Sequence, residues 1–319
     1  MSTARTRARK KARSKKLMRA VAMTLAVICA SALSGLFVYY SLNHQSTNDD
    51  STSKQQPVTA PQKIALIDQL SVQWPDPTFD QTALAILNQT GFQVDYYPSE
   101  NVTVDFYRTL PSHNYKLIVF RVHSTGSTAV QGGPPWVVFF TSENYSKTAY
   151  VQEQTDMRLV YVKFNYSDQK YFGISPAFVT LSMEGTFNKT MIIAMGCEGL
   201  KYDSMAEAFI EKGAKDFISW NGTVLESYTD NATLFLLRHL VAERHTIGEA
   251  VNETMHDVGP DPVYESILTF YPYNADQFYL LTNATAATPT VVTATKDADK
   301  NKENSEDNPT FFDIRTAVA

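Results

Sequence analysis

The chain has 319 residues, 44% of them hydrophobic, which allows one large domain with appendages. Nine of its 28 basic residues lie in the first 19 positions, and the remainder holds 19 basic against 33 acidic residues, a net charge of −14. Binding to nucleic acid through phosphates needs a clustered basic surface, so this class of partner is excluded for the bulk of the chain.

The amino-terminal segment is predicted to anchor the chain in a membrane. Residues 1–19 form a basic cytoplasmic segment, and residues 20–42 are an uncharged, mostly apolar run that is long enough to span a bilayer as a helix. Basic flanks stay in the cytoplasm, so we expect a single-pass protein of the cell membrane with an extracytoplasmic domain. The alternative is a signal peptide cleaved near Ala30-Ser31-Ala32, which would leave a secreted protein.

Three further segments follow the apolar run. Residues 43–62 are rich in Ser, Thr, Asn, Asp, Gln and Pro, a composition that predicts a flexible stalk. Residues 283–319 predict a disordered polar tail. Sustained hydrophobic periodicity is confined to residues 63–282, which are therefore predicted to form one α/β domain.

Nine Asn-x-Ser/Thr sequons occur, all on the predicted outer side of the membrane, which favours a glycosylated exterior. They are Asn88, Asn101, Asn144, Asn165, Asn188, Asn221, Asn231, Asn252 and Asn283. Of the two cysteines, Cys29 lies inside the predicted membrane segment and is interpreted as a small membrane-buried residue. Cys197 is thus alone in the domain, so no disulfide can form within it.

The first part of the domain alternates strands and helices. We expect strands over residues 63–72, 92–97 and 115–123, an amphipathic helix over 80–91 that Gly91 stops, and a short helix that Thr103 caps and that ends before Pro111. This β-α-β-α-β order predicts right-handed crossovers, and therefore a parallel sheet with helices on both faces, a three-layer α/β sandwich.

The second part departs from this alternation before returning to it. A polar loop over residues 124–135 precedes two segments, 136–140 and 159–164, that predict a hairpin or a small added sheet. We then expect a strand running into Cys197, a helix over 204–212, a strand over 217–220, and helices over 231–244 and 246–256. Aromatic alternation in residues 263–281 predicts one or two closing strands.

Two buried strands end on reactive side chains, His123 and Cys197. In an open α/β sheet, reacting groups gather in the crevice outside the carboxyl ends of the strands. If the two strands are neighbours, an imidazole faces a thiol. An imidazole can activate a cysteine nucleophile by taking the thiol proton, and this is the chemistry that the pair predicts.

Residues 192–199, together with 206–209, 213–215, 217–220, 230–233 and 248–250, resemble the caspase-like (clan CD) cysteine peptidases, especially the gingipain-like and CHAT-domain branches. The resemblance is loose over residues 63–282 and close over 117–126 and 190–251. It implies a mainly parallel caspase-like sheet in which a His and the nucleophilic Cys end adjacent strands. His123 would then be the base and Cys197 the nucleophile of peptide-bond hydrolysis.

The chain departs from this family at three points. Met195-Gly196 stands where the caspase signature has Gln-Ala, and the 74 residues between His123 and Cys197 exceed the usual spacing of about 50. The added segments between them would absorb the excess. The family usually has Gly directly after the His, where a backbone N–H helps to form the oxyanion hole, whereas here Ser124 follows. The backbone N–H groups of Ser124 and Cys197 are the expected donors.

Two functional classes remain open. The first is a membrane-anchored extracytoplasmic cysteine endopeptidase that acts on a protein or peptide substrate, its own tail included. The second is a catalytically inactive, glycosylated cell-surface binding module that keeps a caspase-like scaffold. A fold does not decide between them.

Other chemistries find little support in the sequence. No cofactor or metal is expected, because Cys197 with one nearby His leaves the usual zinc ligands unfilled. His239, His245 and His256 fit the role of base less well than His123, because they fall on predicted helices. No Gly-x-Ser-x-Gly elbow of a serine hydrolase occurs. Four acids near the crevice are interpreted as solvated residues at helix starts rather than as an acidic pocket. These acids are Glu198, Asp203, Glu226 and Asp230. For Trp220, two interpretations stay open: it forms a wall of the pocket, or it belongs to the core.

Overall fold

The uncharged β-branched runs become the central strands of an α/β fold. The computed structural model describes residues 62–127, 134–164 and 167–280, so the predicted membrane segment, stalk and tail lie outside the described residues. Across these ranges, no helix combines the length and the apolar character that a membrane span requires.

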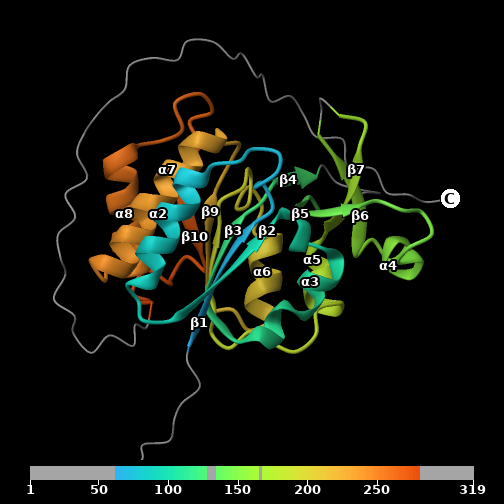
Figure 1. Cartoon of the computed structure of the whole chain (residues 1–319), viewed down its shortest axis with the longest axis horizontal. Helices are drawn as coiled ribbons and strands as arrows, with labels where there is room; N and C mark the ends of the chain where they lie inside the picture. The colour runs from blue at the N-terminus through green and yellow to red at the C-terminus, as the bar shows by residue number, and fades with distance from the viewer. Residues whose placement is uncertain (1–61, 128–133, 165–166, 281–319) are drawn as a thin grey trace, which may run out of the picture. The chain divides into compact units, whose positions relative to one another are not determined.

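The main sheet has six strands in the order β10-β9-β8-β3-β1-β2 (Figure 1). Its strands are β1 (Lys63–Asp68), β2 (Gln93–Pro98), β3 (Tyr115–Arg121), β8 (Met191–Ala194), β9 (Asp216–Trp220) and β10 (Leu268–Tyr271). All neighbours pair in parallel except β10, which runs antiparallel to β9. The prediction of a mainly parallel sheet is therefore confirmed.

Helices cover both faces of this sheet, as predicted (Figure 1). One face packs against α2 (Pro77–Asn88), α7 (Glu226–Leu237) and α8 (Ile247–Val258), and the other against α3 (Val104–Thr109), α5 (Pro176–Leu181) and α6 (Ser204–Glu211). Alternation along β1 shows why: Ile64 and Leu66 lie in one core cluster, whereas Ala65 and Ile67 lie in the other. Such double burial is typical of parallel strands.

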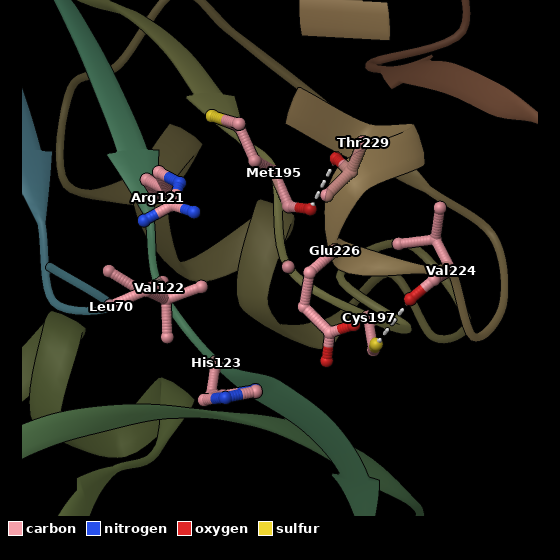
Figure 2. A pocket seen from close by; sticks show the side chains of 10 residues that line it. Leu70, Arg121, Val122, His123, Met195, Cys197, Val224, Glu226 and Thr229 are labelled. Atoms are coloured by element: carbon pink, nitrogen blue, oxygen red, sulfur yellow. Dashed lines mark hydrogen bonds between the residues drawn. The ribbon is translucent and has the colours of Figure 1, made fainter. Parts of the chain in front are cut away.

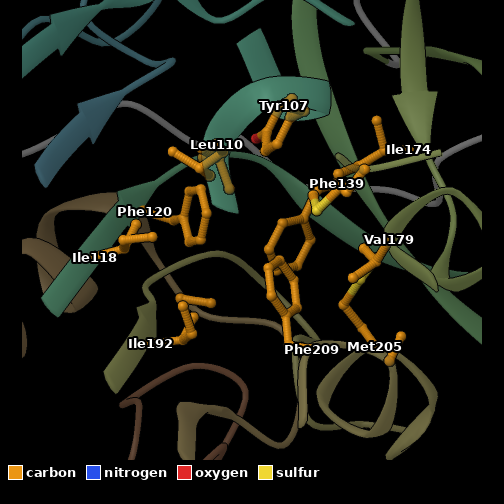
Figure 3. Packing of buried hydrophobic residues seen from close by; sticks show 14 of the residues in the cluster. Tyr107, Leu110, Ile118, Phe120, Phe139, Ile174, Val179, Ile192, Met205 and Phe209 are labelled. Carbon is orange, nitrogen blue, oxygen red and sulfur yellow. The ribbon is translucent and has the colours of Figure 1, made fainter. Parts of the chain in front are cut away.

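A second, antiparallel sheet of four strands lies beside the first, in the order β4-β5-β7-β6. Its strands are β4 (Ser124–Ser127), β5 (Trp136–Asn144), β6 (Leu159–Lys163) and β7 (Lys170–Ile174), and α4 (Val151–Thr155) connects β5 to β6. Phe139 of β5 packs into the core cluster that it shares with Phe120 and Phe209 of the main unit (Figure 3). The small added sheet was predicted, but the hairpin alternative was wrong, because β7 lies between β5 and β6.

Several predicted boundaries move for identifiable reasons. Helix α2 begins at Pro77 rather than at residue 80, because the Asp76 carboxylate accepts hydrogen bonds from Thr78 N (3.1 Å) and Phe79 N (2.9 Å). Strand β1 ends at Asp68, four residues early. The predicted loop 124–135 begins with strand β4, and β10 is a single closing strand.

The predicted helix over residues 231–244 begins five residues early, at Glu226, as α7. It continues into η3, a π-helical turn over Arg238–Ala242. Helix α8 begins behind Thr246, whose side chain forms a capping box with Glu249. Two short 3₁₀ turns, η1 (Ser99–Asn101) and η2 (Leu110–His113), complete the elements of the described ranges.

The sequon asparagines lie on the surface wherever the structure describes them. All seven described members of the set are exposed, while Asn165 and Asn283 lie outside the described residues. Glycosylation remains a prediction, and the exposure meets its steric requirement.

Asp216, at the start of β9, is a carboxyl group in the core. Burial raises its pKa to about 8, an effect that the nearby charge of Lys215 opposes. The unfolded chain loses this proton above about pH 4, whereas the folded protein holds it to about pH 8, so stability falls as the pH rises between these values.

We expect Asp216→Asn to remove this loss. Its melting temperature should exceed that of the wild type by a margin that grows from pH 5 to pH 8, as measured by thermal unfolding. Asp168→Asn, at a fully exposed carboxylate, is the control. It should leave the melting temperature unchanged at both pH 5 and pH 8. A margin that stays constant with pH would contradict the assignment.

Candidate functional site

A small, partly open pocket lies at the carboxyl ends of the central strands. Leu70 follows β1, Val122 and His123 follow β3, and Gly196 and Cys197 follow β8. Val224 and Glu226, which precede and begin α7, close the far side (Figure 2). The strand order reverses between β1 and β3, and ligands of open α/β sheets bind at such a switch point.

Neighbouring parallel strands deliver the two reactive residues to this pocket. Strands β3 and β8 pair in register from Leu117 with Met191 to Phe120 with Ala194, so their adjacency is confirmed. The partners in this register are 74 positions apart in the sequence, and His123 and Cys197 have the same separation. Both line the pocket, from opposite sides of it (Figure 2).

Gly196 permits a close approach between the two strand ends. A Cβ at this position would lie 2.3 Å from both the Ser124 hydroxyl oxygen and the Val122 carbonyl oxygen, so a larger residue would force the segments apart. The Ser124 hydroxyl donates a hydrogen bond of 2.6 Å to the Cys197 carbonyl. Glycine is therefore the residue that this packing requires at position 196.

The backbone N–H of Ser124 points away from β5. Ser124 pairs with Phe139 of β5, and Phe140 N donates to the His123 carbonyl at 2.9 Å. This pattern makes Ser124 and Phe139 a non-hydrogen-bonded pair, in which each N–H points away from the partner strand. Ser124 N lies 3.1 Å from where a Cβ on Gly196 would be, so it is close to the segment that follows β8.

Aromatic rings surround the His123 imidazole. Its centroid lies 4.6 Å from that of Trp74, 4.7 Å from Phe164 and 5.6 Å from Phe140. Burial, and secondarily the positive charge of Arg121, lowers the His123 pKa to about 3. Its backbone N–H donates to the Gln69 side chain at 3.0 Å. The imidazole is therefore neutral at physiological pH in this state.

The Cys197 thiol is likewise held in its neutral form. It donates a hydrogen bond to the Val224 carbonyl at 3.4 Å (Figure 2). Burial raises its pKa to about 12, and the carboxylates of Glu226 and Glu198 add to the rise. The structure thus shows a thiol and an imidazole around one pocket, with neither one charged.

Arg121 lines the pocket and holds the surrounding segments together through its hydrogen bonds. Its guanidinium donates to Asp68 (2.9 Å) and makes two bonds of 2.8 Å to Asp230, in addition to one of 2.9 Å to the Trp74 carbonyl. It lies over the ring of Phe79 at 5.4 Å. One buried side chain therefore joins the ends of β1 and β3 to α2 and α7.

The prediction of solvated acids at helix starts holds for Asp203, the N-cap of α6, and for Glu226, the first residue of α7, but not for Asp230. Asp230 is buried against Arg121, and burial raises its pKa although Arg121 opposes the rise. Glu198 has a left-handed backbone (φ 60°). Its side chain accepts a hydrogen bond of 2.6 Å from the Gly126 N–H, which links the segment after β8 to β4. Asp203 accepts from the Tyr273 hydroxyl at 2.8 Å. Only Glu226 contributes its side chain to the pocket.

Two features of the site were not predicted from the sequence. Arg121 stands inside an apolar run, and a charge in a buried strand could have suggested a buried ion pair. The aromatic surroundings of His123 come from Trp74, Phe140 and Phe164, which lie on three separate segments. Trp220 proves to be fully buried and donates to Thr229, so it is a core residue rather than a pocket wall.

No protein-family model matches the chain, and no curated protein matches its sequence. The functional argument therefore depends on the pocket and on the residues that line it.

The raised pKa of Cys197 makes a prediction about alkylation. The thiolate is the reacting species, so the rate of iodoacetamide labelling at Cys197 should rise about tenfold per pH unit between pH 7 and pH 10 in the absence of substrate. Mass spectrometry of the full chain carrying Cys29→Ala isolates the signal of Cys197. A rate that is flat above pH 6 would instead indicate a preformed thiolate.

Arg121 yields a second prediction, on stability. Arg121→Met leaves Asp68 and Asp230 buried without their partner and should cost about 3–5 kcal/mol of unfolding free energy in urea titrations. Adding Asp68→Asn and Asp230→Asn should restore part of the loss. Lys163→Met, which removes an exposed ion pair at 4.0 Å, should cost less than about 1 kcal/mol. Equal losses in the two single variants would refute a supporting role.

Proposed function

We propose that the chain is a caspase-like cysteine endopeptidase, anchored in the membrane by residues 20–42, with its domain outside the cytoplasm. The single observation that carries the proposal is the placement of His123 and Cys197 after adjacent parallel strands, around one pocket. The basic amino-terminal segment and the exposed sequons support the topology.

The proposed reaction begins when His123 takes the thiol proton of Cys197 as the sulfur attacks the scissile carbonyl carbon. The carbonyl oxygen becomes an oxyanion, which the backbone N–H groups of Ser124 and Cys197 stabilise. The imidazolium then gives its proton to the departing amine, leaving an acyl-enzyme. Water, deprotonated by His123, hydrolyses this thioester and restores the thiol.

The described state is a resting one under this proposal. The thiol bonds to Val224 and the imidazole is packed among aromatic rings, whereas catalysis needs the two in contact. Catalytic hydrogen bonds are often long or misaligned without substrate and tighten only in the substrate complex. Substrate in the pocket would displace the thiol from Val224 and bring it to His123.

A second candidate function has its own supporting observation. Both reactive groups are held neutral, with the pKa of Cys197 raised to about 12 and that of His123 lowered to about 3. A pocket that suppresses ionisation in this way also suits a binding module without activity, on the same scaffold.

Peptide hydrolysis separates the two candidates. Purified full-length chain in detergent should cleave members of a fluorogenic peptide panel, and Cys197→Ala should abolish this activity. His123→Ala should lower kcat/KM by roughly 10²–10⁴-fold, the range for a lost general base. The panel should include peptides with basic side chains, because Glu226 lines the pocket.

His256→Ala is the matched control, since its side chain is 83% exposed and lies outside the pocket. It should retain full activity. Hydrolysis that survives in Cys197→Ala, or the absence of any hydrolysis by a folded wild type, would leave the binding module as the function. A membrane-impermeant thiol probe on intact cells tests the topology with the same protein.

A further inference from the structure

A cluster of two histidines and a glutamate lies at the end of α7 that is remote from the pocket. His239 belongs to η3, and Glu243 and His245 follow it within the turn that leads to α8. One ligand atom from each of the three residues lies within 4.8 Å of the others. Thr229 borders the pocket ten residues earlier, which corresponds to about 15 Å along a helix axis.

The backbone of this turn brings the three side chains together. A regular α-helix would place the residue six positions after His239 on a different face. Here the helix widens into a π-turn that ends at Ala242, and the backbone of Arg244, two residues later, is left-handed (φ 59°). His245 N then bonds to the His239 carbonyl at 2.9 Å, and the two imidazole planes lie 4° from parallel with centroids 5.6 Å apart. Single π-turns occur frequently at functional sites.

Hydrogen bonding orients His239 in the way that metal ligands are oriented. Its Nε2 lies 3.2 Å from an Asp257 oxygen on α8, and its Nδ1 lies 2.6 Å from Glu243 Oε2. A neutral imidazole has one N–H and one lone pair, and ionised carboxylates only accept. If Nε2–H donates to Asp257, Nδ1 is the ring nitrogen that can bind either a proton or a metal ion beside the Glu243 carboxylate. A carboxylate on the second nitrogen is the usual support of a metal-bound histidine.

His245 supplies the third donor. Its Nδ1 is buried, lies 3.8 Å from Glu243 Oε2, and makes no hydrogen bond. A tetrahedral zinc ion with bonds of about 2.0–2.1 Å holds its ligand atoms about 3.3 Å apart, so binding would lengthen the contact of Glu243 Oε2 with His239 (2.6 Å) and shorten its contact with His245 (3.8 Å). Arg238 contacts the other Glu243 oxygen at 3.3 Å, which leaves Oε2 directed to both histidines.

We propose that His239, Glu243 and His245 form a binding site for a divalent transition metal ion, with Zn²⁺ as the ion that fits best. Two imidazoles and a carboxylate are the donors that Zn²⁺ takes in three-ligand sites, and the fourth position is left to water. Asp257 orients His239 from α8, so the bound ion would join the end of α7 to α8. This proposal departs from the expectation, drawn from the sequence, that the chain binds no metal.

Zinc titration of the full chain tests the proposal. The protein should carry no polyhistidine tag and be stripped with a chelator, and Zn²⁺ alone is then added in a calorimeter. We expect one zinc ion per chain and at least a tenfold weaker affinity in His245→Ala and in Glu243→Gln. Zinc should raise the melting temperature of the wild type but of neither variant. Co²⁺ should show the visible absorption of a tetrahedral site.

His256→Ala is the control for adventitious surface binding and should bind zinc like the wild type. The side chains of His245 and Glu243 are 33% and 39% exposed, so their variants should fold, and circular dichroism without metal checks this. If one of these two variants fails to fold, the zinc affinity of the other variant tests the proposal. Failure of the wild type to bind zinc, equal binding by the variants, or loss of binding in His256→Ala would overturn the proposal.

Discussion

The buried guanidinium of Arg121 is the interaction on which the arrangement of the pocket depends. It satisfies Asp68 at the end of β1 and Asp230 on α7, and it stands two residues before His123. Three charges removed from water are tolerable only when each finds a well-placed partner. The network therefore ties the strand ends and α7 to one another, and the walls of the pocket are built on those same segments.

The second sheet controls the chemistry of the pocket more than its shape. Phe140 and Phe164 belong to that sheet and its margin, and they remove water from around His123. Desolvation disfavours a charged imidazole, just as it disfavours a thiolate at Cys197. An added structural element can in this way suppress the ionisation of a pair without altering the strands that carry it. Whether such a pair reacts then depends on how substrate changes the packing around it.

Helix α7 links two regions of different character. Its first turn contributes Glu226 to the pocket, and its far end runs into the π-turn that gathers His239, Glu243 and His245. The helix packs against both α2 and α8 along its length.

The sequence alone determined the alternation of strands and helices, the parallel sheet, and the two strand ends that carry His123 and Cys197. These follow from local signals: uncharged β-branched runs, caps such as Thr103, and stops such as Gly91. Tertiary structure decided what surrounds the pair. The ion pairs of Arg121, the rings around His123 and the bond from Cys197 to Val224 join segments far apart in the chain. Hydrophobic periodicity reports which face of an element is buried, but not which distant side chain will meet it there.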